Sequence, residues 1–331
     1  MSKKFKNNKL LVIMGPTATG KTDIALKLAK KFQGEIISGD SRQVYKRLDI
    51  GTGKLPTKSN QVKIRKGNGF WEINGIKIWA YDLIDPRKQY SVANYIQDAQ
   101  KYLIDLISRN KLPIIVGGTY FYIKALVDGL ENLSQPLDLN LRKKLASFSL
   151  GELQQELKKL SPQKWQELNE SDQQNSRRLV RAIELLQMNL YRDKKKRWRG
   201  LKKTKDILKI GLIAPREILY QNADRRVLIR INQGMIKEAE KLHQKGLTFK
   251  RMKALGLEYA VLADYLQGKI KTLEGPVGFI NILQSKIHGF IRKQLTWLKK
   301  DPQIKWFDMT ESNFEEKIEK MLAKWYYSEI K

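Results

Sequence analysis

The sequence has no cysteine and only two histidines, His243 and His288, among its 331 residues. Without cysteine the chain can form neither a disulfide framework nor a thiolate metal site. Two histidines leave little room for a zinc site or for a catalytic triad built on histidine. The candidate chemistry is therefore limited to carboxylates, hydroxyl groups, cationic side chains and glycine-rich backbone.

Long apolar runs are also missing, because no stretch approaches the roughly 18 residues of a membrane-spanning helix. The basic N-terminus runs directly into the apolar residues 10–14 and lacks the apolar region and cleavage site of a secretory signal. From these absences we expect a cytoplasmic protein that does not enter a membrane. The length is sufficient for about two domains.

Acidic residues are scarce: 34 aspartates and glutamates face 64 lysines and arginines, which leaves a formal net charge of +30. Such a balance predicts a polyanionic partner, with nucleic acid as the first candidate. A generally lysine-rich composition is the alternative explanation. The clustering favours a partner, because residues 191–205 hold nine basic side chains, one acid and Trp198. A basic stretch with an aromatic residue suits phosphate contact combined with base stacking.

The most informative stretch is LLVIMGPTATGKT at residues 10–22. Its apolar start predicts a buried strand, and a helical pattern follows over residues 23–32. The spacing Gly15-x-x-x-x-Gly20-Lys21-Thr22 between them is typical of a phosphate-binding loop. In such a loop the backbone N–H groups and the helix N-terminus bind an anion. Lys21 supplies a charge for the terminal phosphate and Thr22 a hydroxyl for Mg²⁺. The alternative is a glycine-rich turn without a ligand.

Strands and helices alternate over the first third of the chain, which predicts an α/β fold with a doubly wound parallel sheet. Glycine and asparagine punctuate the alternating pattern at residues 60–80, which indicates an antiparallel hairpin beside that sheet. The expected elements are strands over 34–38, 76–83, 112–116 and 207–214, and a helix over 91–108 that starts at Ser91.

The pattern becomes helical and charged from about residue 138 to 200, which indicates an insertion. We expect a core of residues 1–135 and 205–331 and a basic helical insertion domain over residues 136–204. The C-terminal region reads as mostly helical, with one long helix over 216–246 and a short strand over 304–308.

Polar side chains follow several of the predicted strands, at Asp40, Asp82 and Gly117–Thr119. Because the carboxyl ends of parallel strands meet at one edge, we expect these residues to converge with the phosphate loop on one cleft. Asp40 could act as a general base or coordinate Mg²⁺ through water, or it could simply stabilise a turn. Thr119 could donate to a phosphate or a leaving-group oxygen, or cap the next helix.

The strand at 114–116 ends in Gly117-Gly118, without the acidic residue that nucleotide-hydrolysing motors place there for Mg²⁺ and water. This absence weakens an ATPase interpretation and leaves transferases open.

Together the motifs resemble the tRNA dimethylallyltransferases, also called tRNA isopentenyltransferases. The resemblance covers nearly the whole chain, and the combination is far more specific than the phosphate loop alone. The matching stretches are GPTATGKT at 15–22, ISGDSRQVYKRLDIGTGK at 37–54, GGTYFYIKAL at 117–126 and RRLVRAIELL at 177–186.

The resemblance implies a P-loop NTPase-like core that transfers a dimethylallyl group from dimethylallyl diphosphate to N6 of adenosine 37 in tRNA, next to the anticodon. It implies Mg²⁺ as cofactor and catalytic roles for Asp40, Thr119 and Lys21, with Asp40 as the base. The diphosphate would be held by the loop residues Gly15, Pro16, Thr17, Ala18, Thr19, Gly20, Lys21 and Thr22, with Thr22 at the metal. The tRNA anticodon stem-loop would be bound by Asp40, Ser41, Arg42, Gln43, Thr119, Arg177, Arg178 and Arg181.

Three alternatives remain. An isopentenyltransferase acting on free AMP, ADP or ATP would share the loop but would not need the basic insertion. A P-loop small-molecule kinase is disfavoured by the missing strand-end acid. A catalytically silent RNA-binding protein would not need the intact loop together with Asp40. We expect a monomer acting on one tRNA.

Overall fold

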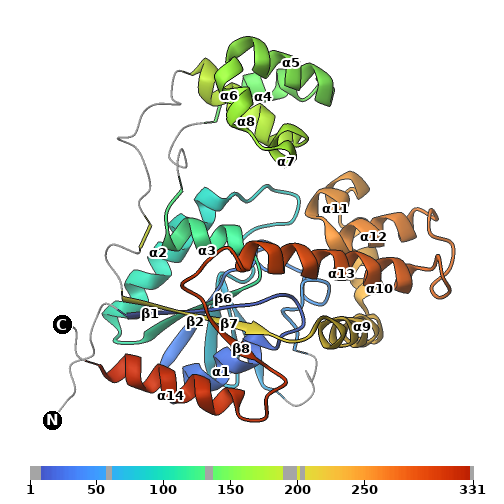
Figure 1. The fold of residues 1–331 in the computed structure, drawn as a ribbon. Coiled ribbons are helices and arrows are strands. Elements are labelled where there is room, and N and C mark those ends of the chain that lie inside the picture. The colour runs from blue at the N-terminus through green and yellow to red at the C-terminus, as the bar shows by residue number, and fades with distance from the viewer. Residues whose placement is uncertain (1–8, 57–61, 131–136, 189–199, 202–205, 329–331) are drawn as a thin grey trace. The chain divides into compact units, whose positions relative to one another are not determined.

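The computed structural model describes residues 9–56, 62–130, 137–188, 200–201 and 206–328 (Figure 1). The chain divides into two compact units, one made of Met1–Val127 with Leu201–Lys331 and the other of Asp128–Gly200. We call them the core unit and the inserted unit. The basic stretch at 191–205 lies, except for residues 200 and 201, outside the described residues.

The described strands of the core unit form one eight-stranded sheet in the order β3-β4-β5-β2-β6-β1-β7-β8. Pairing is antiparallel between β3, β4 and β5 and parallel from β5 to β8. The parallel α/β fold with an antiparallel addition is therefore confirmed. The strands are β1 (Lys9–Met14), β2 (Gly34–Ser38), β3 (Ile64–Gly67), β4 (Phe70–Ile73), β5 (Ile76–Trp79), β6 (Leu112–Gly117), β7 (Asp206–Ile213) and β8 (Lys305–Asp308).

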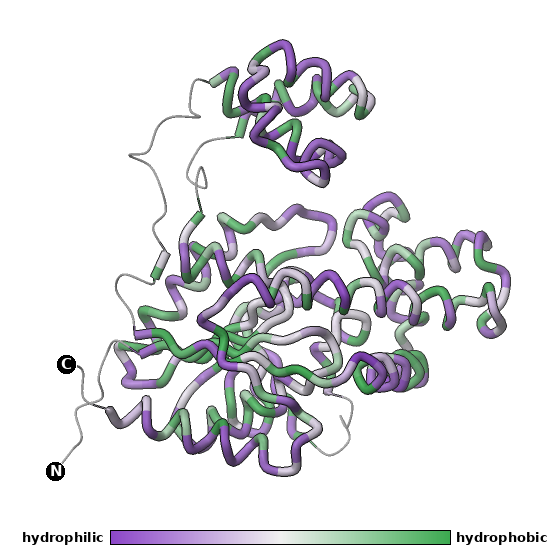
Figure 2. Tube along the Cα trace, viewed as in Figure 1, coloured by the Kyte–Doolittle hydropathy of each residue, from purple (hydrophilic) through white to green (hydrophobic). Residues whose placement is uncertain are grey.

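The central strands β1, β2 and β6 are buried along their whole length. Their near-continuous apolar sequences are typical of parallel strands covered on both faces. Helices α1 (Lys21–Lys31) and α14 (Phe314–Tyr327) cover one face, and α2 (Val92–Ser108) and α3 (Tyr120–Val127) cover the other (Figure 1). The predicted cap at Ser91 is present, because its side chain accepts a hydrogen bond from the Asn94 backbone. Figure 2 shows the hydrophobic strands in the interior of the sheet layer.

The C-terminal helices of the core unit pack around a second apolar cluster that includes Tyr259, Phe279 and Leu283. The prediction of one helix over 216–246 is wrong, because Gly234 adopts a left-handed φ of 95° and separates two helices. The helices are α9 (Arg216–Asn232), α10 (Met235–Gln244), α11 (Phe249–Leu255), α12 (Leu257–Leu266) and α13 (Phe279–Leu298).

The inserted unit contains five helices and no strand of the sheet in its described residues. Its small apolar core includes Leu153, Leu157, Leu179 and Ile183. The helices are α4 (Leu139–Leu145), α5 (Leu150–Leu160), α6 (Pro162–Glu167), α7 (Glu170–Gln173) and α8 (Ser176–Gln187). Among the described helices of both units, none is long and apolar enough to cross a membrane.

Candidate active site

The loop between β1 and α1 is tightly folded against the sheet. A Cβ atom at Gly15 would lie 2.6 Å from the carbonyl oxygen of Leu212 in β7, so only glycine fits there. The hydroxyl of Thr19 donates to the carbonyl oxygen of Pro16 at 2.9 Å and closes the loop. Gly20 precedes α1 with a left-handed φ of 67° and provides no side-chain cap. The N-terminus of α1 therefore presents its backbone N–H groups without a competing side chain, as an anion site requires.

Lys21 lies in this loop and its Nζ atom donates to the carbonyl oxygen of Pro16 at 2.7 Å. Burial and, second, the charge of Arg226 lower the pKa of Lys21 to about 7, and Asp40 acts in the opposite direction. The three side chains therefore lie within one electrostatic neighbourhood. A phosphate group entering it would stabilise the protonated form of Lys21, because an adjacent anion favours the charged state.

Arg226 of α9 is half-buried, and no hydrogen bond or ion pair to its guanidinium is present among the described residues. Burial lowers the pKa of Arg226 to about 10, and neighbouring Arg230 acts in the same direction. Both guanidinium groups lie against Gly53. The carboxylates of Asp23 and Glu258 act in the opposite direction and favour the charged form of Arg226. An anion bound beside Lys21 and Arg226 would stabilise both cations further. Arg226 lies within the helix predicted over 216–246, but the sequence pattern gave no reason to place this arginine in the site.

Asp40 and Thr119 lie at the ends of neighbouring strands, β2 and β6. One carboxylate oxygen of Asp40 accepts a hydrogen bond from the Arg42 backbone N–H at 2.8 Å. The Thr119 hydroxyl oxygen accepts from the Ser41 backbone N–H at 3.1 Å. The same hydroxyl donates to the Ser41 side-chain oxygen at 3.4 Å. Thr119 thus joins the two strand ends and positions the Asp40 loop.

Gln294 of α13 is a site residue to which the sequence pattern gave no role. Its side chain is 6% exposed. Its Oε1 atom accepts from the Thr17 backbone N–H at 2.9 Å, and its Nε2 atom donates to the Gly118 carbonyl oxygen at 2.9 Å. One amide therefore joins the phosphate loop to the loop that carries Thr119. In the sequence it begins the stretch QLTW at residues 294–297, and no local spacing connects it with residue 17.

The combined geometry is that of a phosphate-binding loop with a carboxylate beside it, and comparison with known proteins places it in a family. A model of IPP transferases matches residues 43–301, and one of isopentenyl transferases matches residues 8–66. A tRNA dimethylallyltransferase of Carboxydothermus hydrogenoformans is 35% identical over 96% of this chain and 97% of that protein. The tRNA dimethylallyltransferase 2 of Treponema denticola is 38% identical over 91% and 94% of the two chains.

The chain belongs to the IPP transferase family. Among solved structures, the full-length tRNA isopentenylpyrophosphate transferase of Bacillus halodurans is similar, with a TM-score of 0.66 and 30% identity over 96% of this chain and 97% of that one. A eukaryotic dimethylallyltransferase that acts on tRNA has a TM-score of 0.72 at 22% identity, which supports the fold. The family resemblance and the predicted fold class are confirmed.

Two acidic residues of this IPP transferase have structural partners. Lys54 is completely buried and forms ion pairs with Asp49 and Asp82. Asp82 also accepts a hydrogen bond from the Trp71 indole nitrogen at 2.6 Å. Both Asp82 oxygens are thereby engaged, and its backbone N–H donates to the carbonyl oxygen of Gln43, in the segment that follows Asp40, at 3.3 Å. Its neighbour Asp85 pairs with Arg47 and Arg87, at 2.6 and 2.8 Å.

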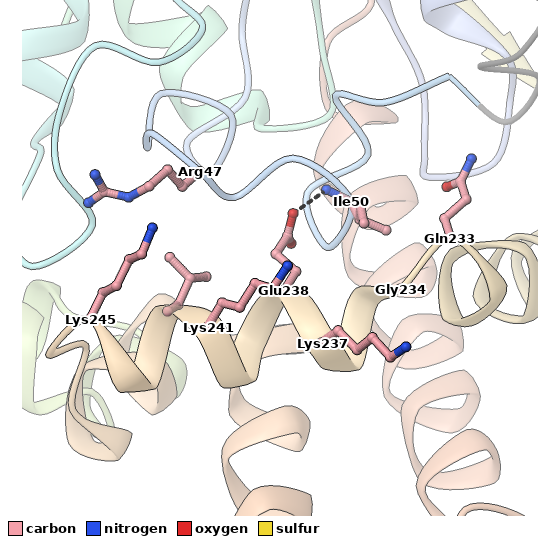
Figure 3. Close-up of a pocket in the computed structure, with 9 residues that line it drawn as sticks. Arg47, Ile50, Gln233, Gly234, Lys237, Glu238, Lys241 and Lys245 are labelled. Carbon is pink, nitrogen blue, oxygen red and sulfur yellow. Dashed lines mark hydrogen bonds between the residues drawn. The ribbon is translucent and has the colours of Figure 1, made fainter.

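The segment that follows Asp40 in this IPP transferase is closed into a loop. Gln43 accepts from the Ser38 hydroxyl at 2.7 Å and donates to the Thr52 carbonyl oxygen at 3.3 Å. Arg42 extends to Gly256, at the junction of α11 and α12. The tip of the loop is held by Glu238 of α10, which accepts hydrogen bonds from the backbone N–H groups of Asp49, Ile50 and Gly51 at 2.9, 2.8 and 3.0 Å (Figure 3).

The three arginines predicted to bind RNA lie on α8 of the inserted unit and differ in environment. Arg181 is 2.5 Å from the fully buried Glu184, which also pairs with Arg142 at 2.7 Å. Burial alone would raise the pKa of Glu184, but hydrogen bonds from Arg142 and Arg181 hold it below its ordinary value. Arg178 pairs with Asp172. Arg177 is exposed and has no partner among the described residues.

Proposed function

We propose that the protein transfers a dimethylallyl group from dimethylallyl diphosphate to N6 of adenosine 37 in tRNA. The proposal rests on one observation: Asp40 and Arg226 both lie close enough to Lys21, at one end of the sheet, to change its pKa. This end of the sheet combines an anion site with a general base.

The transfer breaks the allylic C–O bond and joins the carbon to the adenine N6. Negative charge develops on the departing diphosphate, where Lys21, Arg226 and the N–H groups of the phosphate loop stabilise it. Asp40 accepts the proton that the N6 amine loses. Thr119 holds the Ser41 backbone and so orients the Asp40 loop. Diphosphate and the alkylated adenine are the products.

The described residues suit Mg²⁺ held mainly by the donor. No group of three or more histidine, aspartate or glutamate side chains that could hold a metal exists in the described part of the chain. Mg²⁺ commonly keeps several waters and binds substrate phosphates together with one or two protein oxygens. The half-buried Thr22 at the start of α1 would supply such an oxygen. The ion would neutralise charge on the leaving diphosphate.

The RNA substrate must expose its adenine, because N6 cannot reach Asp40 while the base remains stacked. Residues 40–43 and Thr119 would contact the extruded base, and Arg177, Arg178 and Arg181 the anticodon stem-loop. The reaction would take place in the cytoplasm, with one protein monomer on one tRNA. Free adenylate is the second candidate acceptor, and the basic inserted unit favours RNA over it.

Incubation with labelled dimethylallyl diphosphate, unmodified tRNA and excess AMP distinguishes the two acceptors. We expect the label to enter tRNA, because the inserted unit has no role toward a free nucleotide. We also expect dimethylallyl diphosphate to raise the melting temperature more than ATP does. Label recovered in AMP would contradict the proposed acceptor, and stronger protection by ATP would favour a kinase.

The arginines of α8 allow RNA contact to be separated from stability. We expect Arg177→Gln to weaken tRNA binding and to reduce the slope of log K against log salt by about one, while the melting temperature stays unchanged. Arg181→Gln should instead destabilise the protein by about 1–3 kcal/mol, because the buried Glu184 loses one of its donors. Filter binding across a salt series and urea denaturation measure the two effects. An unchanged slope for Arg177→Gln would exclude that contact.

A further inference from the structure

A pocket of about 390 Å³ lies between α10 and the loop that follows Asp40 (Figure 3). Four cationic side chains line it: Arg47 from the loop, Lys237 and Lys241 from α10, and Lys245, which caps the C-terminus of α10. We call these four residues and the hollow between them the basic groove. Its apolar lining comes from Ile50 and Leu242. None of these residues belongs to the phosphate loop or to the set predicted to bind RNA.

The one acid in the basic groove is already satisfied. Glu238 accepts hydrogen bonds from three backbone N–H groups of residues 49–51 and from the Tyr259 hydroxyl at 2.7 Å. Its carboxylate therefore serves to hold the loop and does not pair with a lysine. Arg47 is held by Asp85 at 2.6 Å. The unneutralised charge of the groove is thus that of the three lysines.

Lys237, Lys241 and Lys245 are exposed, and their side chains form no ion pair or hydrogen bond with any described residue. Their spacing of four residues places them on one face of α10, about 6 Å apart along the helix axis. Figure 3 shows Lys245 pointing toward the loop that carries Arg47, Lys241 beside Glu238, and Lys237 extending from the other end of the helix. Such a row of free ammonium groups matches a linear polyanion better than a single small anion.

The wall of the groove is continuous with the catalytic loop. Arg47 and Ile50 belong to the segment that begins at Asp40, and the hydrogen bond from Gln43 to Thr52 closes this segment on itself. A strand of RNA that places its adenine at Asp40 therefore continues beside the segment that forms the groove. The three lysines extend the cationic surface away from the reacting base.

We propose that the basic groove binds the phosphodiester backbone of the substrate RNA, outside the nucleotide that reacts. The inference rests on the proposed function, because it assumes that the acceptor is RNA. Each lysine–phosphate contact releases counterions from the RNA, so the groove contributes affinity and salt dependence without reading sequence. It has no role in the chemical step or in donor binding.

The test compares two triple variants with equal change in net charge. The groove variant replaces the three groove lysines with glutamine: Lys237→Gln, Lys241→Gln and Lys245→Gln. The control variant replaces three other exposed lysines, whose side chains have no partner among the described residues: Lys30→Gln, Lys305→Gln and Lys324→Gln. For the groove variant we expect tRNA binding to be about ten- to a hundredfold weaker at 0.15 M salt, and the salt slope to fall by about two. The control variant should lose much less.

Turnover at saturating tRNA and the KM for dimethylallyl diphosphate should be the same in the groove variant and the wild type. An equal loss of affinity in both triple variants would show that only net charge matters and would overturn the proposal. A lower turnover at saturating tRNA, or a raised KM for the donor, would also overturn it. Transfer by the wild type to AMP in place of tRNA would instead refute the proposed function. The two failures can be told apart, because the affinity for tRNA and its salt dependence are measured without any transfer reaction.

Discussion

Asp40→Asn is expected to reduce prenyl transfer by about 10²–10⁴-fold, because loss of a positioned general base has effects of this size. The amide of asparagine retains an oxygen that can accept the Arg42 backbone hydrogen bond, so the turn after β2 should survive. What it loses is the ability to accept the proton of the adenine N6. Single-turnover transfer from labelled dimethylallyl diphosphate to tRNA measures the loss.

Ser41→Ala is the matched control for Asp40→Asn. It changes the next residue of the same turn but leaves the Ser41 backbone N–H that bonds to Thr119. We expect transfer within a few fold of wild type. Each variant alters only one of the several contacts proposed for the tRNA, so both should bind tRNA within a few fold of wild type in filter assays. Full activity of Asp40→Asn would refute the assignment of Asp40 as the base.

Arg226→Gln is expected to lower kcat/KM for the donor by about 10²–10³-fold, as removal of one preorganised donor at a developing oxyanion does. The reason is that Arg226 acts on the charge of Lys21 and has no hydrogen-bonded partner among the described residues, although Asp23 and Glu258 favour its charged form through space. The same change should alter the free energy of unfolding by less than about 1 kcal/mol, because it removes a desolvated cation together with its through-space attraction to Asp23 and Glu258. Steady-state kinetics at varied donor concentration measure kcat/KM. Urea denaturation measures the free energy of unfolding.

Arg225→Gln provides the control for this second experiment. Arg225 is the neighbouring residue of α9, but it is exposed and has no partner among the described residues. Arg225 carries the same charge as Arg226, and we expect the Arg225→Gln substitution to leave the donor kinetics unchanged. Equal effects of the two changes would show that Arg226 acts only through overall charge. A strongly destabilised Arg226→Gln variant would indicate a structural role.

The fold was largely predictable because its signals are local. Apolar runs mark the buried strands β1 and β6, and the turn residues Asn74 and Gly75 mark the antiparallel hairpin. The break between α9 and α10 was missed, although Gly234 was visible in the sequence. Glycine inside a helical pattern is often tolerated, and only its left-handed conformation shows that a new helix begins.

The site was predictable only where it is built from motifs. Gly15 to Thr22, Asp40 and Thr119 each follow a strand, so the topology brings them to one edge of the sheet. Which arginine of α9 faces Lys21 depends on the rotation of that helix, which no spacing in the sequence reveals. Gln294 acts on a backbone N–H 277 residues away, and Asp82 is held by the buried Lys54. Such long-range partners follow from tertiary packing alone.

The order of the strands also governs how the protein can assemble on the ribosome. Strand β1 pairs with β6 on one side and with β7 on the other, and β7 is synthesised only after the whole inserted unit. At about 5–20 residues per second, β1 keeps one unpaired edge for roughly 10–40 s after it emerges. Because Gly15 packs against Leu212 of β7, a nascent chain lacks a finished phosphate loop until this late strand docks, and the inserted unit can fold before the catalytic core does.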